Sequence, residues 1–168
     1  MILTARLSIR ELVEDDAPFV VQLLNDPAFL QYVGDKGVRT LDEAREYITT
    51  GPRAMYAEFG FGLWVVELPD GTPIGLCGLL KRPVLDDVDL GFALLPQFRR
   101  AGYTLEAASA VMAYARETLQ LDRLVAIVNP DNEASASLLE RLGFSFEESR
   151  TVFPGAPPLK VFAASLER

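Results

Sequence analysis

The sequence contains no histidine and only one cysteine, and these two scarcities exclude much enzyme chemistry. Catalytic groups of the Ser-His-Asp or Cys-His type need an imidazole as base, so neither can be built here. A zinc site of histidine and cysteine ligands lacks donors, and one thiol cannot form an internal disulfide. Cys77 lies in the apolar run 74–80, where we expect a small buried side chain rather than a reactive thiol. We therefore expect no metal site and no thiol catalysis.

Long apolar runs are also missing. No stretch of about 18 apolar residues occurs, so no membrane span is expected. Residues 1–6 lack the apolar core of a secretory signal. The impossibility of an internal disulfide fits a reducing compartment. We expect a cytoplasmic protein without a membrane partner.

Positive charge is scarce, because 16 Lys and Arg face 24 Asp and Glu, which gives a net charge of −8. An acidic surface disfavours nucleic acid, whose binding depends on basic patches that neutralise phosphates. It attracts cationic partners at long range, and an amine substrate is cationic. Acidity that serves only solubility would produce the same composition. We expect no nucleic-acid partner, and the charge leaves these two roles open.

The length of 168 residues and the 49% hydrophobic content suit one compact domain over residues 1–168. Strands and helices are interleaved along the chain, which predicts an α/β fold. Apolar runs and alternation predict strands at residues 6–10, 63–68, 74–80, 88–94, 124–128, 144–147 and 159–165. Capping residues and apolar faces predict helices at residues 15–25, 40–48, 105–119 and 132–142, with Gly51 and Pro52 ending the second.

The most informative stretch runs from the strand at 88–94 through a loop into the next helix. Such a loop offers backbone N–H groups without internal partners, and the helix dipole favours a phosphate there. Arg99 and Arg100 add charge-assisted donors, and Gly102 lets the backbone approach a ligand closely. The residues fit a pyrophosphate site, and they also fit an ordinary loop with two solvated arginines.

A second polar segment, residues 129–135, follows the strand at 124–128 and begins with Asn129. Polar side chains at a strand end and a helix start can point into a shared crevice. Asn132 and Ser135 are three residues apart, so they can face the same side of the helix. The same residues can equally serve only as helix caps.

Together these segments resemble the GNAT acetyltransferases, most closely the branch with the ribosomal-protein N-terminal acetyltransferases of the RimJ/RimL type. The resemblance spans nearly the whole chain. The late signature of the family is matched almost letter for letter by Asn132-x-x-Ser135-x-x-Leu138-Leu139-Glu140-Arg141-Leu142-Gly143-Phe144. The other matching segments are the opening Arg6-Leu7-Ser8-Ile9-Arg10, residues 74–79, the central strand at 89–96 and the coenzyme A loop at 97–102.

The resemblance implies the GNAT fold, with a mixed, mostly antiparallel central sheet that is splayed at the coenzyme A site and flanked by helices. It implies acetyl-coenzyme A as cosubstrate, an amine as acceptor, and no metal. The assembly stays open between a monomer and a homodimer.

The resemblance also assigns roles to individual residues. Backbone N–H groups of residues 99–104 would hold the pyrophosphate, and residues 92–94 would pair with pantetheine beside the strand at 124–128. Asn132 would contact the pantetheine arm, and Ser135 would lie near the thioester sulfur. The residues expected to bind the coenzyme are Phe92, Ala93, Leu94, Arg99, Arg100, Ala101, Gly102, Tyr103, Thr104, Asn129 and Asn132.

Two positions depart from the family pattern. Arg100 stands where the loop usually has its first glycine, so a positive φ there would be strained. Leu139 stands where many GNAT enzymes have a tyrosine general acid. The RimL-like branch also lacks that tyrosine, and the resemblance transfers its acid role to Ser135.

Asp89 is the candidate base or water-mediated relay, at a position where the family often has Glu. A carboxylate in an ion pair is an equally valid interpretation of Asp89. Glu67 is a second candidate base. Tyr32, Phe61 and Trp64 can line an amine pocket or belong to the core.

The sequence therefore predicts direct acetyl transfer to a primary amine, either a protein N-terminus or a small amine. A different class stays open, a non-catalytic GNAT-fold module that binds coenzyme A or a partner protein. Arg100 in the coenzyme loop favours that second class.

Overall fold

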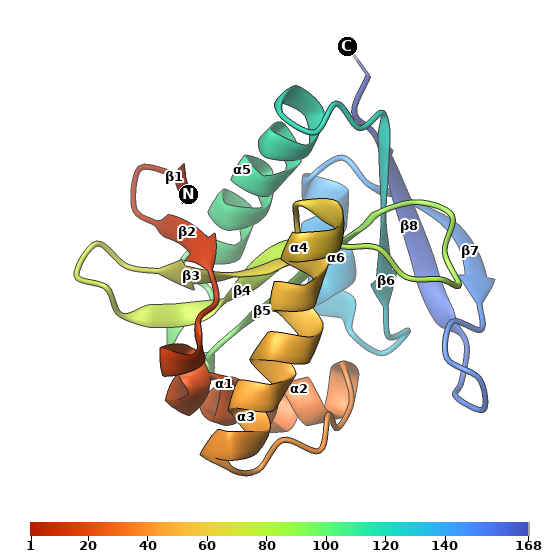
Figure 1. Cartoon of the computed structure of the whole chain (residues 1–168). Helices are drawn as coiled ribbons and strands as arrows, with labels where there is room; N and C mark the ends of the chain where they lie inside the picture. The colour runs from red at the N-terminus through yellow and green to blue at the C-terminus, as the bar shows by residue number, and fades with distance from the viewer. Residues whose placement is uncertain (168) are drawn as a thin grey trace.

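The computed structural model describes residues 1–167 and contains one eight-stranded sheet in the order β1-β2-β3-β4-β5-β6-β8-β7 (Figure 1). The strands are β1 (Ile2–Leu3), β2 (Ser8–Glu11), β3 (Leu63–Glu67), β4 (Pro73–Leu80), β5 (Asp89–Leu94), β6 (Arg123–Val128), β7 (Ser145–Arg150) and β8 (Leu159–Ser165). The α-helices are α1 (Ala17–Leu24), α2 (Pro27–Tyr32), α3 (Leu41–Ile48), α4 (Ala54–Phe59), α5 (Tyr103–Glu117) and α6 (Glu133–Arg141). The predicted mixed, mostly antiparallel sheet with flanking helices is confirmed.

Helices cover both faces of the sheet because the strands alternate their side chains between the two faces. Val65 of β3 packs with the buried side of α1 and α3 in one apolar cluster. Trp64 and Val66, its neighbours in the same strand, pack with α5 in the other cluster. Figure 1 shows α1 to α4 gathered on one side of the sheet. This packing of helices on both faces holds in place the helix N-termini that surround the site described below.

The predicted end of the second helix at Gly51 and Pro52 is wrong. After α3 the chain continues through a wider π-helical turn, Thr49–Arg53, directly into α4. A π turn accommodates a proline that would break a regular helix, because the local hydrogen-bonding ladder is already displaced. The helix ends instead at Gly60, whose φ of 80° is the left-handed conformation of a C-terminal cap.

Two short elements escaped prediction, the strand β1 and the helix α2. The predicted first helix stops at Leu24, and α2 starts at Pro27. The side chain of Asp26 caps α2 by accepting a hydrogen bond from the Phe29 N–H at 3.3 Å. An Asp-Pro pair is thus a helix start here, because proline is well suited to the first helical position.

The buried face of α5 consists mostly of small side chains. Ala108 and Ala115 are fully buried, whereas Met112 is only partly buried. Ala107 and Val111 complete the buried stripe. Small side chains on this stripe allow α5 to lie close to the sheet.

Cys77 is a free, fully buried thiol, as predicted. Burial raises its pKa to about 12, so the thiolate is not formed near neutral pH. Among residues 1–167, no helix is both long and apolar enough to span a bilayer.

Candidate active site

The sheet splits between β5 and β6. This is the one parallel pair of the described sheet, and its register holds a single pair of residues, Asp89 and Val125. The Val125 N–H also donates to the Val88 carbonyl at 3.0 Å. Beyond this point the strands diverge. Because both run in the same direction, the gap opens toward the loops that follow their carboxyl ends.

The predicted pantetheine-binding residues lie along this gap. Phe92, Ala93 and Leu94 pair with β4 through one edge of β5, and β6 does not pair with them on the other edge. An unpaired strand edge presents N–H and C=O groups to an extended ligand. The structure therefore has an open edge at the position where the sequence predicted one.

The Arg99 side chain holds the loop, a role that was not predicted. Its guanidinium donates to the Leu94 carbonyl at 3.2 and 2.9 Å and pairs with the Asp26 carboxylate at 2.7 Å. Its backbone N–H donates to the Pro96 carbonyl at 3.2 Å. Arg99 thus fastens the loop to the protein through Nε and Nη2, and its contact with a phosphate stays a prediction.

Arg100 has a φ of 66°, in the left-handed region, so the strain predicted for this position is present. Two residues later Gly102 has a φ of 82°, which costs a glycine little. The loop therefore keeps its left-handed turn although the residue there is an arginine. Surrounding contacts must hold this conformation in place.

The start of α5 leaves backbone N–H groups free. The first hydrogen bond of this helix runs from the Glu106 N–H to the Gly102 carbonyl at 3.1 Å. No group in the described part of the chain accepts from the N–H of Gly102, Tyr103 or Thr104. Free N–H groups at a helix N-terminus bind anions well. This supports Gly102, Tyr103 and Thr104 as the backbone donors of the predicted phosphate site.

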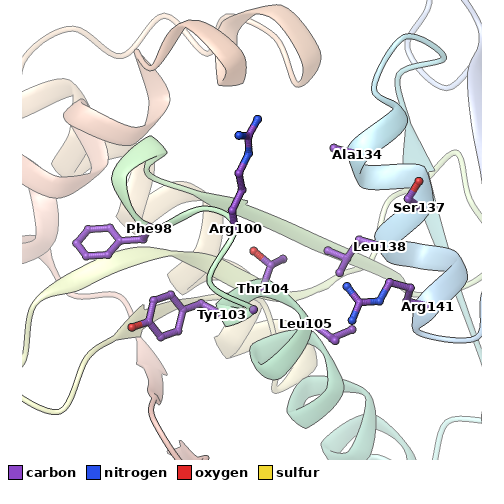
Figure 2. A pocket seen from close by; sticks show the side chains of 10 residues that line it. Phe98, Arg100, Tyr103, Thr104, Leu105, Ala134, Ser137, Leu138 and Arg141 are labelled. Carbon is purple, nitrogen blue, oxygen red and sulfur yellow. The ribbon is translucent and has the colours of Figure 1, made fainter.

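A cavity of about 240 Å³ lies between this loop, the start of α5 and one face of α6. Figure 2 shows Leu138 and Arg141 pointing from α6 toward Thr104 and Leu105. Arg100 and Arg141 both line the cavity, and neither forms an ion pair within residues 1–167. In a chain of net charge −8, two unpaired guanidiniums at one cavity favour an anionic ligand.

The α6 side of the cavity was missed from the sequence. Its residues are Ala134, Ser137, Leu138 and Arg141. They recur at i, i+3, i+4 and i+7, which is the spacing of one helical face. That spacing was the signal that could have found them, but the prediction considered only the polar segment that ends at Ser135.

Asn132 and Ser135 form a small network at the start of α6. The Ser135 N–H donates to Asn132 Oδ1 at 3.2 Å, which caps the helix as predicted. This bond fixes the orientation of the amide, so that Asn132 Nδ2 faces Ser135 Oγ and donates to it at 3.0 Å. Because the amide nitrogen can only donate, the Ser135 hydroxyl accepts here and keeps its own proton for another acceptor.

Asn129 shapes the turn before α6. Its Oδ1 accepts a hydrogen bond from the Asp131 N–H at 2.9 Å, as asparagine does in an Asx turn. The carbonyl oxygen of this side chain is therefore engaged within the chain. Its contact with the coenzyme stays a prediction.

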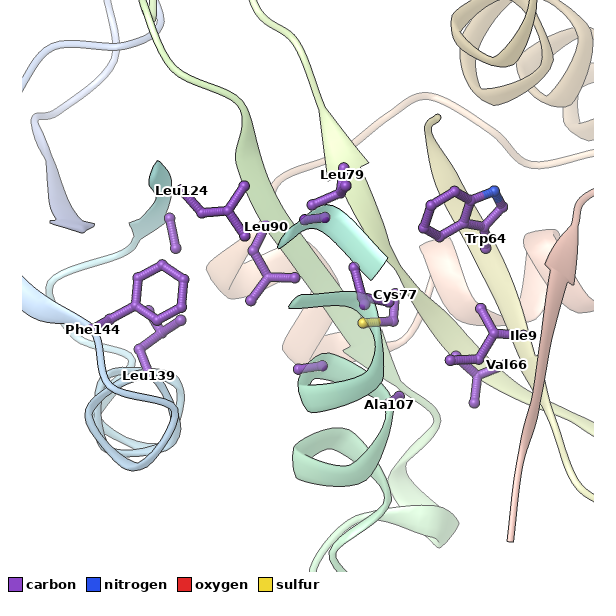
Figure 3. Close-up of a cluster of buried hydrophobic side chains, with 14 of the residues drawn as sticks. Ile9, Trp64, Val66, Cys77, Leu79, Leu90, Ala107, Leu124, Leu139 and Phe144 are labelled. Carbon is purple, nitrogen blue, oxygen red and sulfur yellow. The ribbon is translucent and has the colours of Figure 1, made fainter. Parts of the chain in front are cut away.

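Ser135 lies on the same helical face as Leu139, which is fully buried. Figure 3 shows Leu139 beside Phe144 in the core. The position at which many GNAT enzymes carry a tyrosine is thus filled by a packing residue. Among the residues at the start of α6, Ser135 is the hydroxyl that this inner face offers.

Asp89 lies at the closed end of the gap, and its side chain is only 1% exposed. Arg82 Nε approaches its two carboxylate oxygens at 3.2 and 3.4 Å. Burial raises the pKa of Asp89 to about 6, and the charge and hydrogen bond of Arg82 oppose that rise. A carboxyl with a pKa near 6 is poised to take up and release a proton near neutral pH.

The other candidates for the amine side occupy structural positions. Glu67 pairs with Arg10 at 3.2 Å on β3, and β4 separates it from β5. Phe61 and Trp64 are 7% and 6% exposed and belong to the core, which was one of the two interpretations. Tyr32 ends α2 and is half-buried. Glu67 stays a second candidate base, and a role of Tyr32 in an amine pocket stays a prediction.

Known proteins share this sequence and this fold. Residues 6–145 match the family described as acetyltransferase (GNAT) domain. The uncharacterized N-acetyltransferase YoaA of Bacillus subtilis is 30% identical over 149 residues, which cover 86% of this chain and 82% of YoaA.

Solved structures agree with these sequence matches. An acetyltransferase from Agrobacterium tumefaciens has a TM-score of 0.81 and 30% identity, over 96% of this chain and 91% of the other. RimL, a ribosomal L7/L12 α-N-protein acetyltransferase in complex with coenzyme A, has a TM-score of 0.82 over 96% and 95% of the two chains. Its identity of 19% supports the shared fold alone.

Proposed function

Because the chain belongs to the acetyltransferase (GNAT) family and is an acetyl-coenzyme A-dependent N-acetyltransferase, we propose that it acetylates a primary amine by direct transfer, with both substrates bound together. The observation that carries this proposal is the gap between β5 and β6, which leads to the free N–H groups at the start of α5. An extended pantetheine arm fits along the unpaired edge at residues 92–94. The diphosphate then reaches Gly102, Tyr103 and Thr104.

The amine must lose a proton before it attacks, because only the neutral form has a free electron pair. Asp89 is the base that we assign, acting through water because its carboxylate is buried under Arg82. Its pKa of about 6 leaves it ionised at neutral pH and able to take the proton. The nitrogen then forms a bond to the thioester carbon. The unpaired N–H groups of β5 are placed to stabilise the negative charge on the carbonyl oxygen.

The carbon–sulfur bond breaks in the next step, and the sulfur leaves as a thiolate that needs a proton. Ser135 is the donor that we assign, because Asn132 occupies the acceptor side of its hydroxyl and leaves the proton available. Two protons leave the nitrogen, one to Asp89 before the attack and a second after the carbon–nitrogen bond has formed. One of them balances the proton that the thiolate gains from Ser135, and the other is released to solvent. Exchange with solvent restores both residues to their starting state, and no covalent enzyme intermediate is required.

The acceptor is a primary amine, and we place a protein N-terminus first, as in the RimJ/RimL branch. The segment at residues 132–144, which resembles the late signature of that branch, supports this choice, and so does the net charge of −8, which attracts a cationic acceptor. Small amines are the second class. The one cysteine, Cys77, is a free thiol, which fits a reducing compartment, so the cytoplasm is the proposed location.

The first experiment is a calorimetric titration with acetyl-coenzyme A, with desulfo-coenzyme A as the control ligand. We expect saturable binding in the micromolar range, about −8 kcal/mol. Thiol release is then measured with free peptides, with the same peptides N-terminally acetylated, and with polyamines. Turnover that needs a free α-amine supports a protein acceptor, and turnover with polyamines supports the second class. No binding at millimolar coenzyme would contradict the proposal.

A further inference from the structure

The N-terminal segment, through Thr4 and Arg6, contacts the first turn of α5. Arg6 Nε pairs with Glu106 Oε1 at 2.7 Å, and the Arg6 backbone N–H donates to Glu106 Oε2 at 2.9 Å. The Thr4 hydroxyl donates to the same Oε2 at 2.5 Å. Partial burial would raise the pKa of Glu106, but these three donors lower it below its usual range. The carboxylate of Glu106 is therefore a fixed anchor for this segment.

Arg6 also holds the coenzyme loop itself. Its Nη1 donates to the Ala101 carbonyl at 3.0 Å. Its guanidinium carbon lies 4.4 Å from the centre of the Tyr103 ring, a cation–π contact. A Cβ added to Gly102 would lie 3.3 Å from Arg6 Nη2, so the side chain packs directly on the loop backbone. Three consecutive residues of the loop thus touch one arginine.

The direction of these contacts has a consequence for anion binding. In a trans peptide the carbonyl and the N–H point to opposite sides, so holding the Ala101 carbonyl directs the Gly102 N–H away from Arg6. Figure 2 shows the Tyr103 ring, against which Arg6 lies, pointing away from α6. The Gly102 N–H therefore points to the cavity side, where the free donors of α5 gather.

From these contacts we infer that Arg6 is a positioning residue of the coenzyme loop, which sets the affinity for the diphosphate of coenzyme A without touching it. This inference rests on the proposed function. Arg99 fastens the loop from one side through Asp26, and Arg6 fastens it from the other through Glu106. Between them stands Arg100, whose left-handed φ needs such support. A lysine can neutralise Glu106 but cannot also bind Ala101 and stack flat on Tyr103.

The test compares Arg6→Gln and Arg6→Lys with Arg45→Gln. Arg45 is a matched control, because it is 44% exposed against 45% for Arg6 and its ion pair, to Asp42, has the same length of 2.7 Å. For Arg6→Gln we expect KM for acetyl-coenzyme A to rise roughly 10-fold, with kcat and the amine KM within about twofold. The KM for S-acetylpantetheine, which lacks the diphosphate, should not change. Arg6→Lys should keep most of the defect, and Arg45→Gln should behave as wild type.

Three results would overturn the inference. These are an unchanged KM in Arg6→Gln, an equal loss with S-acetylpantetheine, and full activity in Arg6→Lys, which would mean that only the charge matters. Amide hydrogen exchange of residues 99–104 in the ligand-free protein gives an independent readout. Faster exchange in Arg6→Gln than in Arg45→Gln is expected even if the wild type transfers no acetyl group. If the wild type transfers no acetyl group, that result counts against the proposed function alone. The hydrogen-exchange measurement then decides whether Arg6 positions the loop.

Discussion

The two ends of β5 solve opposite problems. At the Asp89 end the strand pairs with β6, and a carboxylate is buried beneath one arginine. At the Leu94 end the strand has lost its partner, and the chain turns into a loop with free N–H groups. One end buries the Asp89 carboxylate and raises its pKa, and the other end exposes backbone donors that can bind an anion. A single strand thus separates proton chemistry from coenzyme binding.

The same difference appears in how each end is held. Asp89 has one charged partner, Arg82, whose guanidinium carbon also lies 5.6 Å from the centre of the Phe153 ring. The loop at the other end is fastened by two arginines that each bind a carboxylate and a backbone carbonyl. Changes at the closed end should therefore alter pH dependence, and changes at the open end should alter coenzyme affinity.

The largest effect is expected for Asp89→Asn. Loss of a general base lowers kcat by roughly 100- to 10,000-fold, and we expect a decrease in that range at pH 8. In the wild type the rate should fall as the pH falls through about 6, because the base becomes protonated. Steady-state rates measured between about pH 5 and 9, on both sides of pH 6, check both statements. Asp87→Asn is the control. Asp87 lies two positions before Asp89, but it is 38% exposed and pairs with Arg123 instead of Arg82. A normal rate in Asp89→Asn would show that Asp89 is not the base.

Asp89 also links stability to pH. Its pKa is raised in the folded state, so it contributes stability that is fully present at low pH and is lost as the pH rises through about 6. Asp89→Asn removes this titration. We expect the free energy of unfolding of the variant, relative to wild type, to increase between acidic and neutral pH. Urea unfolding on the two sides of pH 6 measures the difference, and a constant difference would contradict the raised pKa.

At the open end, Ser135→Ala should have the next largest effect. We expect kcat to fall roughly 10- to 100-fold, which is below the usual range for general acid catalysis, because the thiolate can still take a proton from solvent. Calorimetry should show coenzyme affinity within about twofold of wild type, since the helix cap from Asn132 to the Ser135 N–H remains. Ser109→Ala, an exposed serine of α5, is the control. Unchanged turnover in Ser135→Ala would exclude Ser135 from the mechanism.

A smaller change is expected for Arg82→Gln. Arg82 lowers the pKa of Asp89 against the effect of burial, so its removal should raise that pKa further above its usual value. The acid limb of the pH–rate profile should move to higher pH, with a clear loss at pH 6 and nearly full activity at pH 9. Arg123→Gln removes a neighbouring arginine that pairs with Asp87 and Glu147 instead. A limb that stays in place would show that Asp89 does not control it.

Most of the fold could be predicted from local sequence patterns. The helix predicted at residues 40–48 corresponds to α3, which starts with a capping box of Thr40 and Glu43, and the strand pattern of residues 88–94 corresponds to β5. These features depend on residues a few positions apart, so the sequence contains them directly. Asp26 misled the prediction because Asp-Pro is compatible with either end of a helix, and only the tertiary structure decides between them.

The candidate site was less predictable, because its key contacts join distant residues. Arg99 meets Asp26, 73 positions away, and Arg6 meets Glu106, 100 positions away. Neither distance leaves a local pattern, so Arg99 was assigned to the ligand and Arg6 received no role. The strain at Arg100 was predictable because it follows from one residue type at one position of the loop.

The smallest effect is expected for Arg100→Gly. A left-handed φ costs a non-glycine residue about 1–2 kcal/mol, and glycine loses about 0.5–1 kcal/mol through its greater freedom when unfolded. The variant should therefore be more stable by up to about 1.5 kcal/mol, measured by thermal unfolding. Coenzyme affinity should fall a few-fold at low salt, because one unpaired guanidinium leaves the cavity. If affinity rises instead, strain in the loop costs more binding than the charge of Arg100 contributes, and the open end of β5 binds its ligand through backbone donors alone.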